Sequence, residues 1–393
     1  IRIEDPGVDK AEFVLAVGGI REWHQAKRSH PAGRWSLSTL ASANVELLQA
    51  IGALLDGNTD RFVFVSATDA RELAELADRA RQAETLQEFE IVFLAAKEHA
   101  ERFAQLRKEW DNCDLGTAYD RLRRIEVRTA DERTIEELSR CGIAVVYLGS
   151  PNDLITELRT IAEDSVHVTI TRQELIAKLA TRGFAMRRAV HPDSALAIVE
   201  DTTRRYLESV RGKLIRRTLV PRAETQTLLG ILGDRASDVV LTGKAGGGKT
   251  GCAMEFVDEL RSRGLPVLAL RLDRIDPVST AEELGRKAGL EDSPALVLAA
   301  AAQGREAVLV IDQLDAISTA PGRSRGLFDA IEGILTETRG LRERANIHVI
   351  IVCREFDWEN DYRLKTLLAK GHGRVSVDVF PLERVRELLA VMA

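Results

Sequence analysis

The chain has 393 residues, more than one ordinary hydrophobic core supports, so its length predicts about two or three domains. Hydrophobic residues make up 45% and charged residues 30%, a composition typical of a soluble globular protein. The formal net charge of −6 excludes nucleic-acid binding through a bulk positive field, so any such binding requires a local basic face.

The cysteines lie too far apart for a zinc-binding spacing or a disulfide framework, which predicts a reducing cytoplasm. No apolar run approaches the ~18 residues of a membrane span and no signal peptide is visible, so we expect a cytoplasmic protein without a membrane partner. The sequence begins at Ile1 rather than Met, and it stops within an apolar helix-like run at residues 384–393. We therefore expect both ends to be truncated relative to the natural protein.

Residues 1–190 have the pattern of one α/β domain. Two strand-like runs, residues 12–17 and 20–27, flank Gly18-Gly19, which is a strong signal for a two-residue hairpin. The elements expected after the hairpin are a strand at residues 61–65, helices at residues 69–83 and 86–110, a buried strand at residues 143–148 and a helix that begins at Pro151.

The dipeptide His191-Pro192 marks a domain boundary, and residues 191–215 are expected to form a helical linker. Residues 216–393 then alternate strand-like and helix-like segments, which predicts a three-layer α/β domain with a mostly parallel sheet. The strand-like runs of this second domain lie at residues 238–242, 267–272, 307–311, 348–353 and 375–379.

The segment from Gly243 to Thr250, Gly-Lys-Ala-Gly-Gly-Gly-Lys-Thr, is a Walker A loop, since it follows an apolar strand and opens into a helix-like stretch. Its glycines let backbone N–H groups close around phosphate oxygens, and the helix N-terminus adds positive potential. Lys249 is expected to reach the β- and γ-phosphates, and Thr250 to ligate Mg²⁺. The pattern predicts a site for ATP or ADP with Mg²⁺. The glycines expected at the nucleotide are Gly243, Gly246, Gly247 and Gly248.

Residues 307–312 form a buried-strand run that ends in an acid, the pattern of a Walker B strand in which Asp312 holds Mg²⁺. The next residue is Gln313, at the position where many ATPases place a catalytic glutamate. Because an amide is a poor base, we expect slow hydrolysis. Asp315 lies three residues past Asp312 and either polarises the attacking water or caps a helix.

Residues 219–224, Leu-Val-Pro-Arg-Ala-Glu, lie shortly before the Walker A loop. They resemble the apolar-apolar-Gly-Arg-Glu motif that opens the nucleotide domain of STAND NTPases, the group that contains NACHT and NB-ARC proteins. Pro221 replaces the usual glycine of this motif, and Ala223 replaces the usual glutamate. The resemblance implies that Arg222 lies close to the nucleotide, on its adenine side.

Two further segments resemble the same family. Residues 312–315 are similar to the acidic pair of its Walker B region, and residues 350–354 are similar to its sensor strand, which ends in an arginine. The resemblance covers residues 216–393. It implies that Arg354 reads the γ-phosphate through a charge-assisted contact.

The N-terminal hairpin carries Gln-Ala-Lys at residues 25–27, which resembles the Gln-X-Lys core motif of the Mrr branch of PD-(D/E)XK nucleases. Residues 7–9, Gly-Val-Asp, match the upstream Gly-X-Asp of that branch. Residues 35–40 and 62–66 are similar to the double-stranded-DNA endonuclease effector domain of CBASS-type anti-phage systems. The resemblance implies a restriction-endonuclease-like α/β fold for residues 1–190.

The hairpin turn brings the start of its first strand close to the end of its second, where Gln25 and Lys27 share one face. Asp9 is expected to hold Mg²⁺ there, and Lys27 to orient or activate the attacking water. Gln25 offers only an amide oxygen, so its bond to the metal is expected to be weak, and Asp5 or Glu4 is expected to supply the missing carboxylate. The alternative is an exposed polar strand face that binds no metal.

These patterns predict an ATP-binding molecular switch that controls a Mg²⁺-dependent endonuclease for double-stranded DNA in anti-phage defence. A phage-derived trigger would act through a C-terminal region that is not present, and homo-oligomerisation would accompany activation. The alternative is an ATP-dependent regulatory scaffold whose N-terminal domain binds a partner or DNA without cleavage. A DNA-translocating motor is disfavoured by Gln313.

Overall fold

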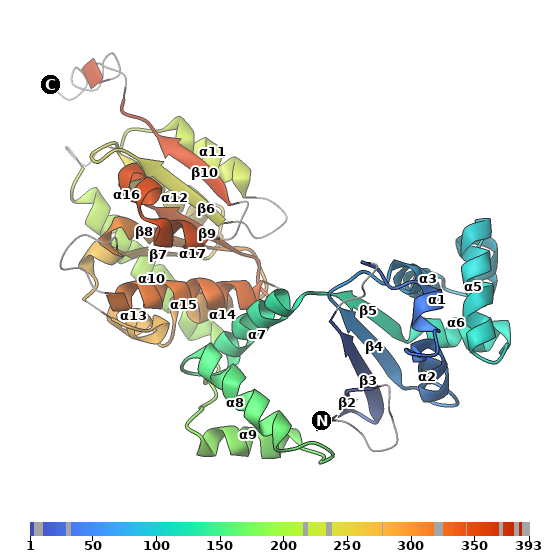
Figure 1. Cartoon of the computed structure of the whole chain (residues 1–393). Helices are drawn as coiled ribbons and strands as arrows, with labels where there is room; N and C mark the ends of the chain where they lie inside the picture. The colour runs from blue at the N-terminus through green and yellow to red at the C-terminus, as the bar shows by residue number, and fades with distance from the viewer. Residues whose placement is uncertain are drawn as a thin grey trace. The chain divides into compact units, whose positions relative to one another are not determined.

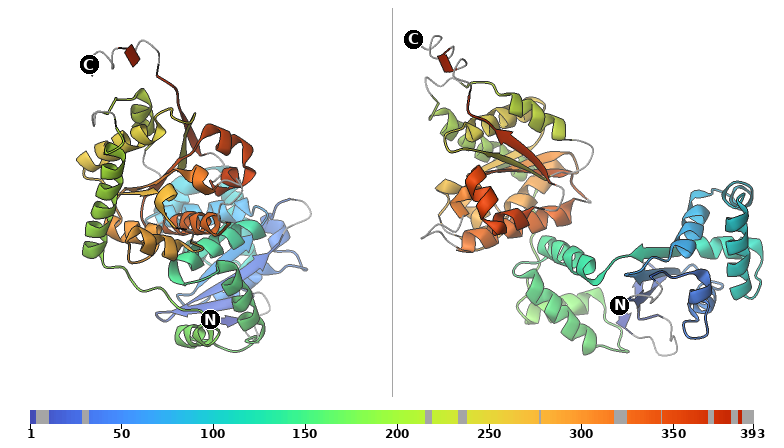
Figure 2. Two further views of the ribbon diagram at one scale, coloured as in Figure 1. Left: turned by 90° about the vertical axis from the view of Figure 1, so that its left-hand side faces the viewer. Right: turned by 45° about the horizontal axis from the view of Figure 1, so that its top comes forward.

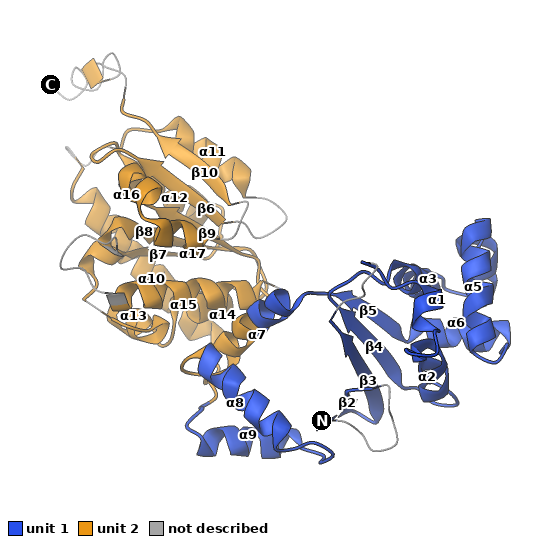
Figure 3. Cartoon of the chain, in the orientation of Figure 1, with its two compact units in different colours: residues 1–139, 152–185 blue, residues 140–151, 186–393 orange. Residues whose placement is uncertain are grey.

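The structure is a computed structural model that describes residues 1–3, 11–28, 33–214, 219–232, 238–276, 278–317, 325–342, 344–368, 372–380 and 385–386. The chain forms two compact units, unit 1 (residues 1–139 and 152–185) and unit 2 (residues 140–151 and 186–393) (Figure 1, Figure 3). Each unit contains its own β-sheet with helices, so the predicted α/β class is confirmed. None of the helices in the described ranges combines the length and apolar character needed to cross a membrane.

The sheet of unit 1 is mixed, with the strand order β1-β2-β3-β4-β5. Its first three strands pair antiparallel, whereas β3, β4 and β5 are parallel, so the carboxyl ends of these three strands meet at one edge. The predicted hairpin is confirmed: Gly18 and Gly19 have φ values of 61° and 85°, which glycine adopts readily. The strands are β1 (Arg2–Ile3), β2 (Phe13–Val17), β3 (Ile20–Lys27), β4 (Arg61–Ser66) and β5 (Ile125–Thr129).

Helices of unit 1 pack against one face of its sheet, where Phe62 and Phe64 of β4 are fully buried. The helix predicted over residues 86–110 is interrupted by a π-helical turn and a short loop. The helical segments are α1 (Leu37–Leu40), α2 (Leu47–Leu54), α3 (Arg71–Gln82), α4 (Leu86–Glu88), the π-helix η1 (Phe89–Phe93), α5 (Lys97–Glu109), α6 (Leu115–Arg123), α8 (Pro151–Glu163) and α9 (Arg172–Thr181).

The strand predicted at residues 143–148 is wrong, because most of that run belongs to helix α7 (Glu132–Val146). The apolar residues of this run fall on a helical stripe with Cys141, and Cys141 and Ala144 are buried. A short apolar run cannot be assigned to a strand or a helix by periodicity alone. The helix predicted to begin at Pro151 is confirmed as α8.

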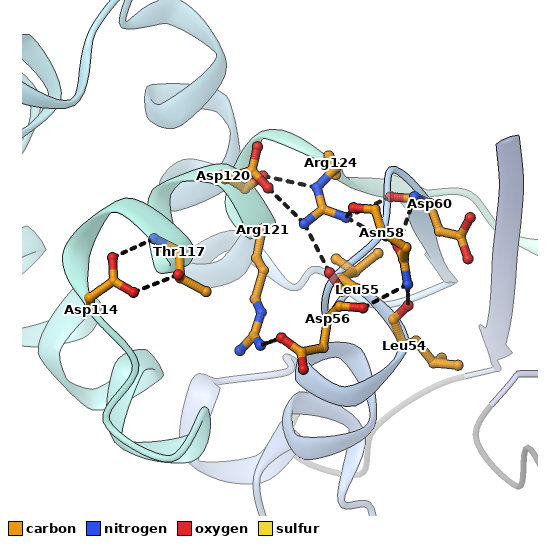
Figure 4. A network of polar contacts seen from close by, with 10 residues as sticks. All are labelled: Leu54, Leu55, Asp56, Asn58, Asp60, Asp114, Thr117, Asp120, Arg121 and Arg124. Carbon is orange, nitrogen blue, oxygen red and sulfur yellow. Dashed lines mark hydrogen bonds and ion pairs between the residues drawn. The ribbon is translucent and has the colours of Figure 1, made fainter.

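Strand β5 was not predicted, and a polar network fixes its start beside β4 (Figure 4). Arg124, the residue before β5, donates hydrogen bonds to the carbonyl oxygens of Leu55 (3.0 Å), Asn58 (3.0 Å) and Asp60 (3.1 Å). These three residues belong to the segment between α2 and β4. One guanidinium group therefore ties the entrances of the two strands together.

The sheet of unit 2 is entirely parallel, with the strand order β10-β6-β9-β8-β7. All five strands predicted in this region are confirmed. The residues of β6, β8 and β9 are buried throughout, which explains why these strands read as continuous apolar runs. The strands are β6 (Asp238–Gly243), β7 (Val267–Arg271), β8 (Ala307–Asp312), β9 (Ile347–Val352) and β10 (Gly373–Val377).

Helices cover both faces of this sheet, as predicted for a three-layer domain (Figure 2). Leu309 and Ile311 of β8 enter one hydrophobic cluster, and Val308 and Val310 enter the cluster on the opposite face. The helical segments are α10 (Pro192–Arg211), α11 (Ala223–Ile231), α12 (Lys249–Ser262), η3 (Leu272–Arg274), α13 (Ala281–Ala288), α14 (Pro294–Ala302), η4 (Leu314–Ile317), α15 (Arg325–Leu341), α16 (Glu355–Asn360) and α17 (Tyr362–Leu367).

Helix α10 lies along the edge strand β7 and is part of the domain, although we expected residues 191–215 to be a linker. The Thr203 hydroxyl donates to the Val267 carbonyl (2.6 Å) and accepts from the Ala269 N–H (3.2 Å). A side chain thus satisfies backbone groups that an edge strand otherwise leaves unpaired. This contact seats α10 firmly on the sheet.

Candidate nucleotide-binding site

The Walker A segment has the backbone geometry of an anion-binding loop. Strand β6 ends at Gly243, and α12 begins at Lys249 after a tight loop. Gly246 and Gly248 have φ values of 74° and 93°, a conformation that side-chain-bearing residues rarely adopt. Gly248 is the N-cap of α12 and has no side chain that could accept a hydrogen bond. The first N–H groups of the helix therefore face the loop without a side-chain cap from this residue.

A cleft of about 290 Å³ opens between this loop and the carboxyl ends of β8 and β9. Because β6, β9 and β8 are neighbours in a parallel sheet, the residues that follow them meet at one edge. The structure thereby brings together most of the side chains predicted for this site. The cleft is lined by Ala245, Gly246, Gly248, Lys249, Thr250, Asp312, Gln313, Asp315, Val352 and Arg354.

The Lys249 ammonium is held within the loop itself. Its Nζ donates to the carbonyl oxygens of Gly243 and Lys244, at 3.0 Å in each case. Burial lowers the pKa of Lys249, and the nearby Asp315 carboxylate opposes that shift. The carbonyl groups of the loop thus stabilise the charged ammonium.

Asp312, the last residue of β8, is completely buried and fully hydrogen-bonded. Its Oδ1 accepts from the Thr250 hydroxyl (3.3 Å) and the Gln313 N–H (2.9 Å), and its Oδ2 accepts from the Tyr206 hydroxyl (3.3 Å). Burial raises the pKa of Asp312 to about 6, although the charge of Arg271 acts in the opposite direction. A carboxylate and a hydroxyl thus lie side by side in the cleft.

This pair of oxygen donors fits Mg²⁺. The ion prefers oxygen ligands and commonly keeps several waters, so one or two protein ligands suffice when substrate phosphates supply others. Thr250 and Asp312 are the residues that would hold it. Among the residues that the structure describes, no group of three or more His, Cys, Asp or Glu side chains is arranged to bind a metal without such help.

Gln313 and Asp315 occupy the region where a water-activating base is usually found. Gln313 has a φ of 65°, and its amide donates to the Thr250 hydroxyl at 3.3 Å. Asp315 lies inside η4, so it does not cap a helix, and its Oδ2 accepts from Arg354 Nε at 3.0 Å. The carboxylate closest to the expected base position is thus already in an ion pair.

Arg222 supports the Walker A loop from outside the cleft. Its guanidinium donates to the carbonyl oxygens of Gly247 (2.6 Å) and Asp378 (2.8 Å), and it stacks on the Phe380 ring at 3.7 Å. A Cβ atom at Gly248 would lie 2.5 Å from Arg222 Nη2, so the guanidinium lies directly against the loop backbone. Its donors thus face carbonyl oxygens, whereas the resemblance implies a contact with the nucleotide.

The residues predicted for the N-terminal site lie at the end of β3. Gln25 is buried, and its amide Nε2 donates to the Glu12 carboxylate at 3.0 Å, whereas Lys27 is exposed. Glu12 was not predicted. It precedes β2, its N–H donates to the His24 carbonyl opposite, and its carboxylate reaches the Gln25 amide. Glu4, Asp5 and Asp9 lie outside the described residues.

No protein-family model and no curated protein matches the chain. Solved structures with partial similarity include the Aeropyrum pernix Orc1 protein in complex with DNA (17% identity, 44% of this chain, 50% of that chain, TM-score 0.31). A chain of the E. coli MS115-1 HORMA:CdnC:Trip13 complex also matches (16% identity, 62% of this chain, 72% of that chain, TM-score 0.23). The chain thus spans about half the length of the Orc1 protein. The strand, loop and cleft described above define a P-loop nucleotide-binding fold on their own geometry.

Proposed function

We propose that unit 2 binds ATP and ADP together with Mg²⁺ and works as a slow, switch-type ATPase. The observation that carries the proposal is the convergence of Lys249, Thr250 and Asp312 in one cleft beside an open helix N-terminus. Lys249 exchanges its loop carbonyls for the β- and γ-phosphates, and Thr250 and Asp312 hold Mg²⁺. When bound, the ion neutralises negative charge on the transferring phosphoryl group.

The pair between Arg354 and Asp315 supplies the difference between the two nucleotide states. Arg354 Nε lies 3.0 Å from Asp315 Oδ2. A γ-phosphate competes with the Asp315 carboxylate for the Arg354 guanidinium, whereas ADP leaves the pair intact. Helix α16 begins directly after Arg354, so movement of this side chain is transmitted to a helix of the domain. Hydrolysis is slow because the Gln313 amide cannot take a proton from water.

We also propose that the protein is of the STAND type, on the resemblance of residues 219–224, 312–315 and 350–354. In this proposal the ATP-bound state assembles into a homo-oligomer, and a phage-derived trigger favours that state. The switch then controls unit 1.

For unit 1 we propose a Mg²⁺-dependent endonuclease that cleaves double-stranded DNA in anti-phage defence. Support comes from Gln25 and Lys27 at the carboxyl end of β3, with the Glu12 carboxylate in hydrogen-bond contact with the Gln25 amide. Asp9 or Asp5 supplies the metal-binding carboxylate, and Lys27 orients the attacking water. Arg28, the exposed residue after Lys27, would contact phosphates.

The alternative, a regulatory scaffold without cleavage, is favoured by one observation. The Gln25 amide donates a hydrogen bond to the Glu12 carboxylate. In this arrangement one carboxylate oxygen of Glu12 already has a hydrogen-bond partner other than a metal ion. In this case the strand edge binds a partner or DNA, and unit 2 remains the nucleotide switch. The two proposals thus differ in unit 1 alone.

Calorimetric titration of the full chain with ATP tests the first proposal, carried out once in the presence of Mg²⁺ and once in the presence of EDTA. We expect binding that Mg²⁺ strengthens, and turnover near or below about 1 s⁻¹. Failure to bind ATP in either condition would overturn the nucleotide site. A plasmid-cleavage assay on the same sample then separates the proposals for unit 1: metal-dependent cleavage supports the nuclease, and DNA binding without cleavage supports the scaffold.

A further inference from the structure

Tyr206 reaches the Walker B carboxylate from a part of the chain that belongs to neither Walker motif. It lies on α10, and its hydroxyl donates to Asp312 Oδ2 at 3.3 Å. The ring is only 4% exposed and packs in the same cluster as Val308 and Val310 of β8. A tyrosine on the helix that covers the sheet edge is therefore in direct contact with a candidate metal ligand.

The two oxygens of Asp312 have different partners. Oδ1 accepts from the Thr250 hydroxyl and from the Gln313 N–H, both of which line the cleft side of the carboxylate. Oδ2 accepts from Tyr206. Rotation about the Cβ–Cγ bond of an aspartate is soft, so hydrogen bonds decide which oxygen faces the metal position. Without the Tyr206 hydroxyl, Oδ2 loses this hydrogen bond, and the orientation of the carboxylate depends on the two donors to Oδ1.

We propose that Tyr206 is a positioning residue for Mg²⁺: its hydroxyl fixes the Asp312 carboxylate with Oδ1 toward Thr250. This inference rests on the proposed nucleotide site. It also makes metal binding depend on how α10 is seated. Thr203, less than one turn earlier on the same helix, holds α10 to β7 through the Val267 carbonyl, so helix and carboxylate are fixed by adjacent contacts.

The first test is Tyr206→Phe in the full chain, which removes the hydroxyl and keeps the ring. We expect affinity for ATP with Mg²⁺ to fall about tenfold, because a hydrogen bond to a charged group is lost. Affinity for ATP in EDTA stays unchanged, since the effect passes through the metal. Tyr119→Phe is the matched control: it removes another buried hydroxyl, which donates to the Ala83 carbonyl at 2.8 Å in unit 1, and alters neither affinity.

A double-mutant cycle then decides whether the effect passes through Asp312. In an Asp312→Asn background, Tyr206→Phe should cause no further loss of Mg²⁺-dependent affinity. An equal loss in both backgrounds, or an equal loss with Mg²⁺ and with EDTA, would show that Tyr206 is merely structural and would overturn the inference. Wild-type protein that binds no ATP would refute the nucleotide site instead, so the two failures are distinguishable.

Thermal unfolding establishes whether Tyr206→Phe retains the fold. Where it does not, Thr203→Val provides the test, because it keeps Tyr206 and releases the hydrogen bonds between α10 and β7. We expect a selective loss of Mg²⁺-dependent affinity of about threefold, less than the full value of a hydrogen bond. Unchanged affinity in a folded Thr203→Val protein would contradict the link between α10 and the metal site.

Discussion

The two units differ in how their candidate sites are assembled. In unit 2, glycine conformations and strand ends bring Lys249, Thr250 and Asp312 into a single cleft. In unit 1, Gln25 is buried against Glu12 while Lys27, two residues later on the same strand, is exposed. The first site is built largely from backbone, and its sequence signature is therefore local. The second is built from side chains on separate strands, so it depends on register and on residues distant in the sequence.

The largest effect is expected from Lys249→Ala, which removes the cation expected on the phosphates. Affinity for ATP should fall by about 100-fold or more, because several charge-assisted hydrogen bonds are lost together. Calorimetric titration measures it. Lys287→Ala is the control, since that lysine lies on the surface of the same unit in a pair with Asp276. A Lys249→Ala protein that binds ATP normally would show that the cleft of unit 2 is not the nucleotide site, and the contrast with the candidate site of unit 1 would be lost.

In unit 1 the corresponding change is Lys27→Ala. Cleavage of plasmid DNA should fall by about 100-fold, the usual contribution of a group that activates water, and ATP affinity should not change. Lys97→Ala is the matched control, because Lys97 is 89% exposed and pairs with Glu101 on a helix surface. Cleavage that survives in Lys27→Ala would exclude Lys27 from the reaction. Cleavage that persists in EDTA would exclude a metal-dependent mechanism altogether.

Gln313→Glu sharpens the comparison from the other direction, because it places a carboxylate at the position next to Asp312, where the site now has an amide. The carboxylate would stand beside Thr250, where the Gln313 amide lies now, and ATP turnover should rise about tenfold. A coupled phosphate-release assay measures the rate. Gln313→Asn is the control, since it tolerates the left-handed backbone at φ 65° without adding a base. Equal rates in the two variants would show that the attacking water lies elsewhere.

The fold of unit 2 could be predicted because its three central strands, β6, β9 and β8, are buried on both faces and consist largely of apolar residues. Unit 1 was harder. Strand β5, Ile-Glu-Val-Arg-Thr, is short and two of its five residues are charged, and Arg124 fixes its place through carbonyls of a distant loop. The one wrong strand, the apolar run at the end of α7, lies in the part of α7 that belongs to unit 2. It has the length of a strand, and only the packing of Cys141 and Ala144 decides that it is helical.

The candidate nucleotide site was predicted where its residues belong to contiguous motifs. Tyr206 could not be predicted, because it lies 106 residues before its partner Asp312 and has no sequence pattern of its own. The sequence placed Asp315 and Arg354 in the site, but it could not indicate that they pair with each other. Such partners are set by the order of strands in the sheet, which brings β9 between β6 and β8.

The smallest effect is expected from Arg222→Lys, which tests whether this arginine supports the loop or binds the nucleotide. A lysine keeps the charge but loses the planar group that donates to two carbonyl oxygens and stacks on Phe380. Losing this stack and one hydrogen bond should lower the free energy of unfolding by about 2 kcal/mol. The unfolding midpoint should fall by about 5 °C. Thermal unfolding without nucleotide measures this loss.

If Arg222 acts only through the loop, ATP affinity should fall less than about tenfold, well below the loss at Lys249, because the loop backbone can still close on phosphates. Arg263→Lys is the control, since Arg263 is the exposed C-cap residue of α12 and pairs with Glu259. An affinity loss as large as that of Lys249→Ala, with an unchanged unfolding midpoint, would mean that Arg222 leaves the Gly247 and Asp378 carbonyls to contact the nucleotide itself. In that case the site in unit 2 would also include a side chain from outside the Walker motifs. The two units would then differ only in how many of their site residues come from distant segments.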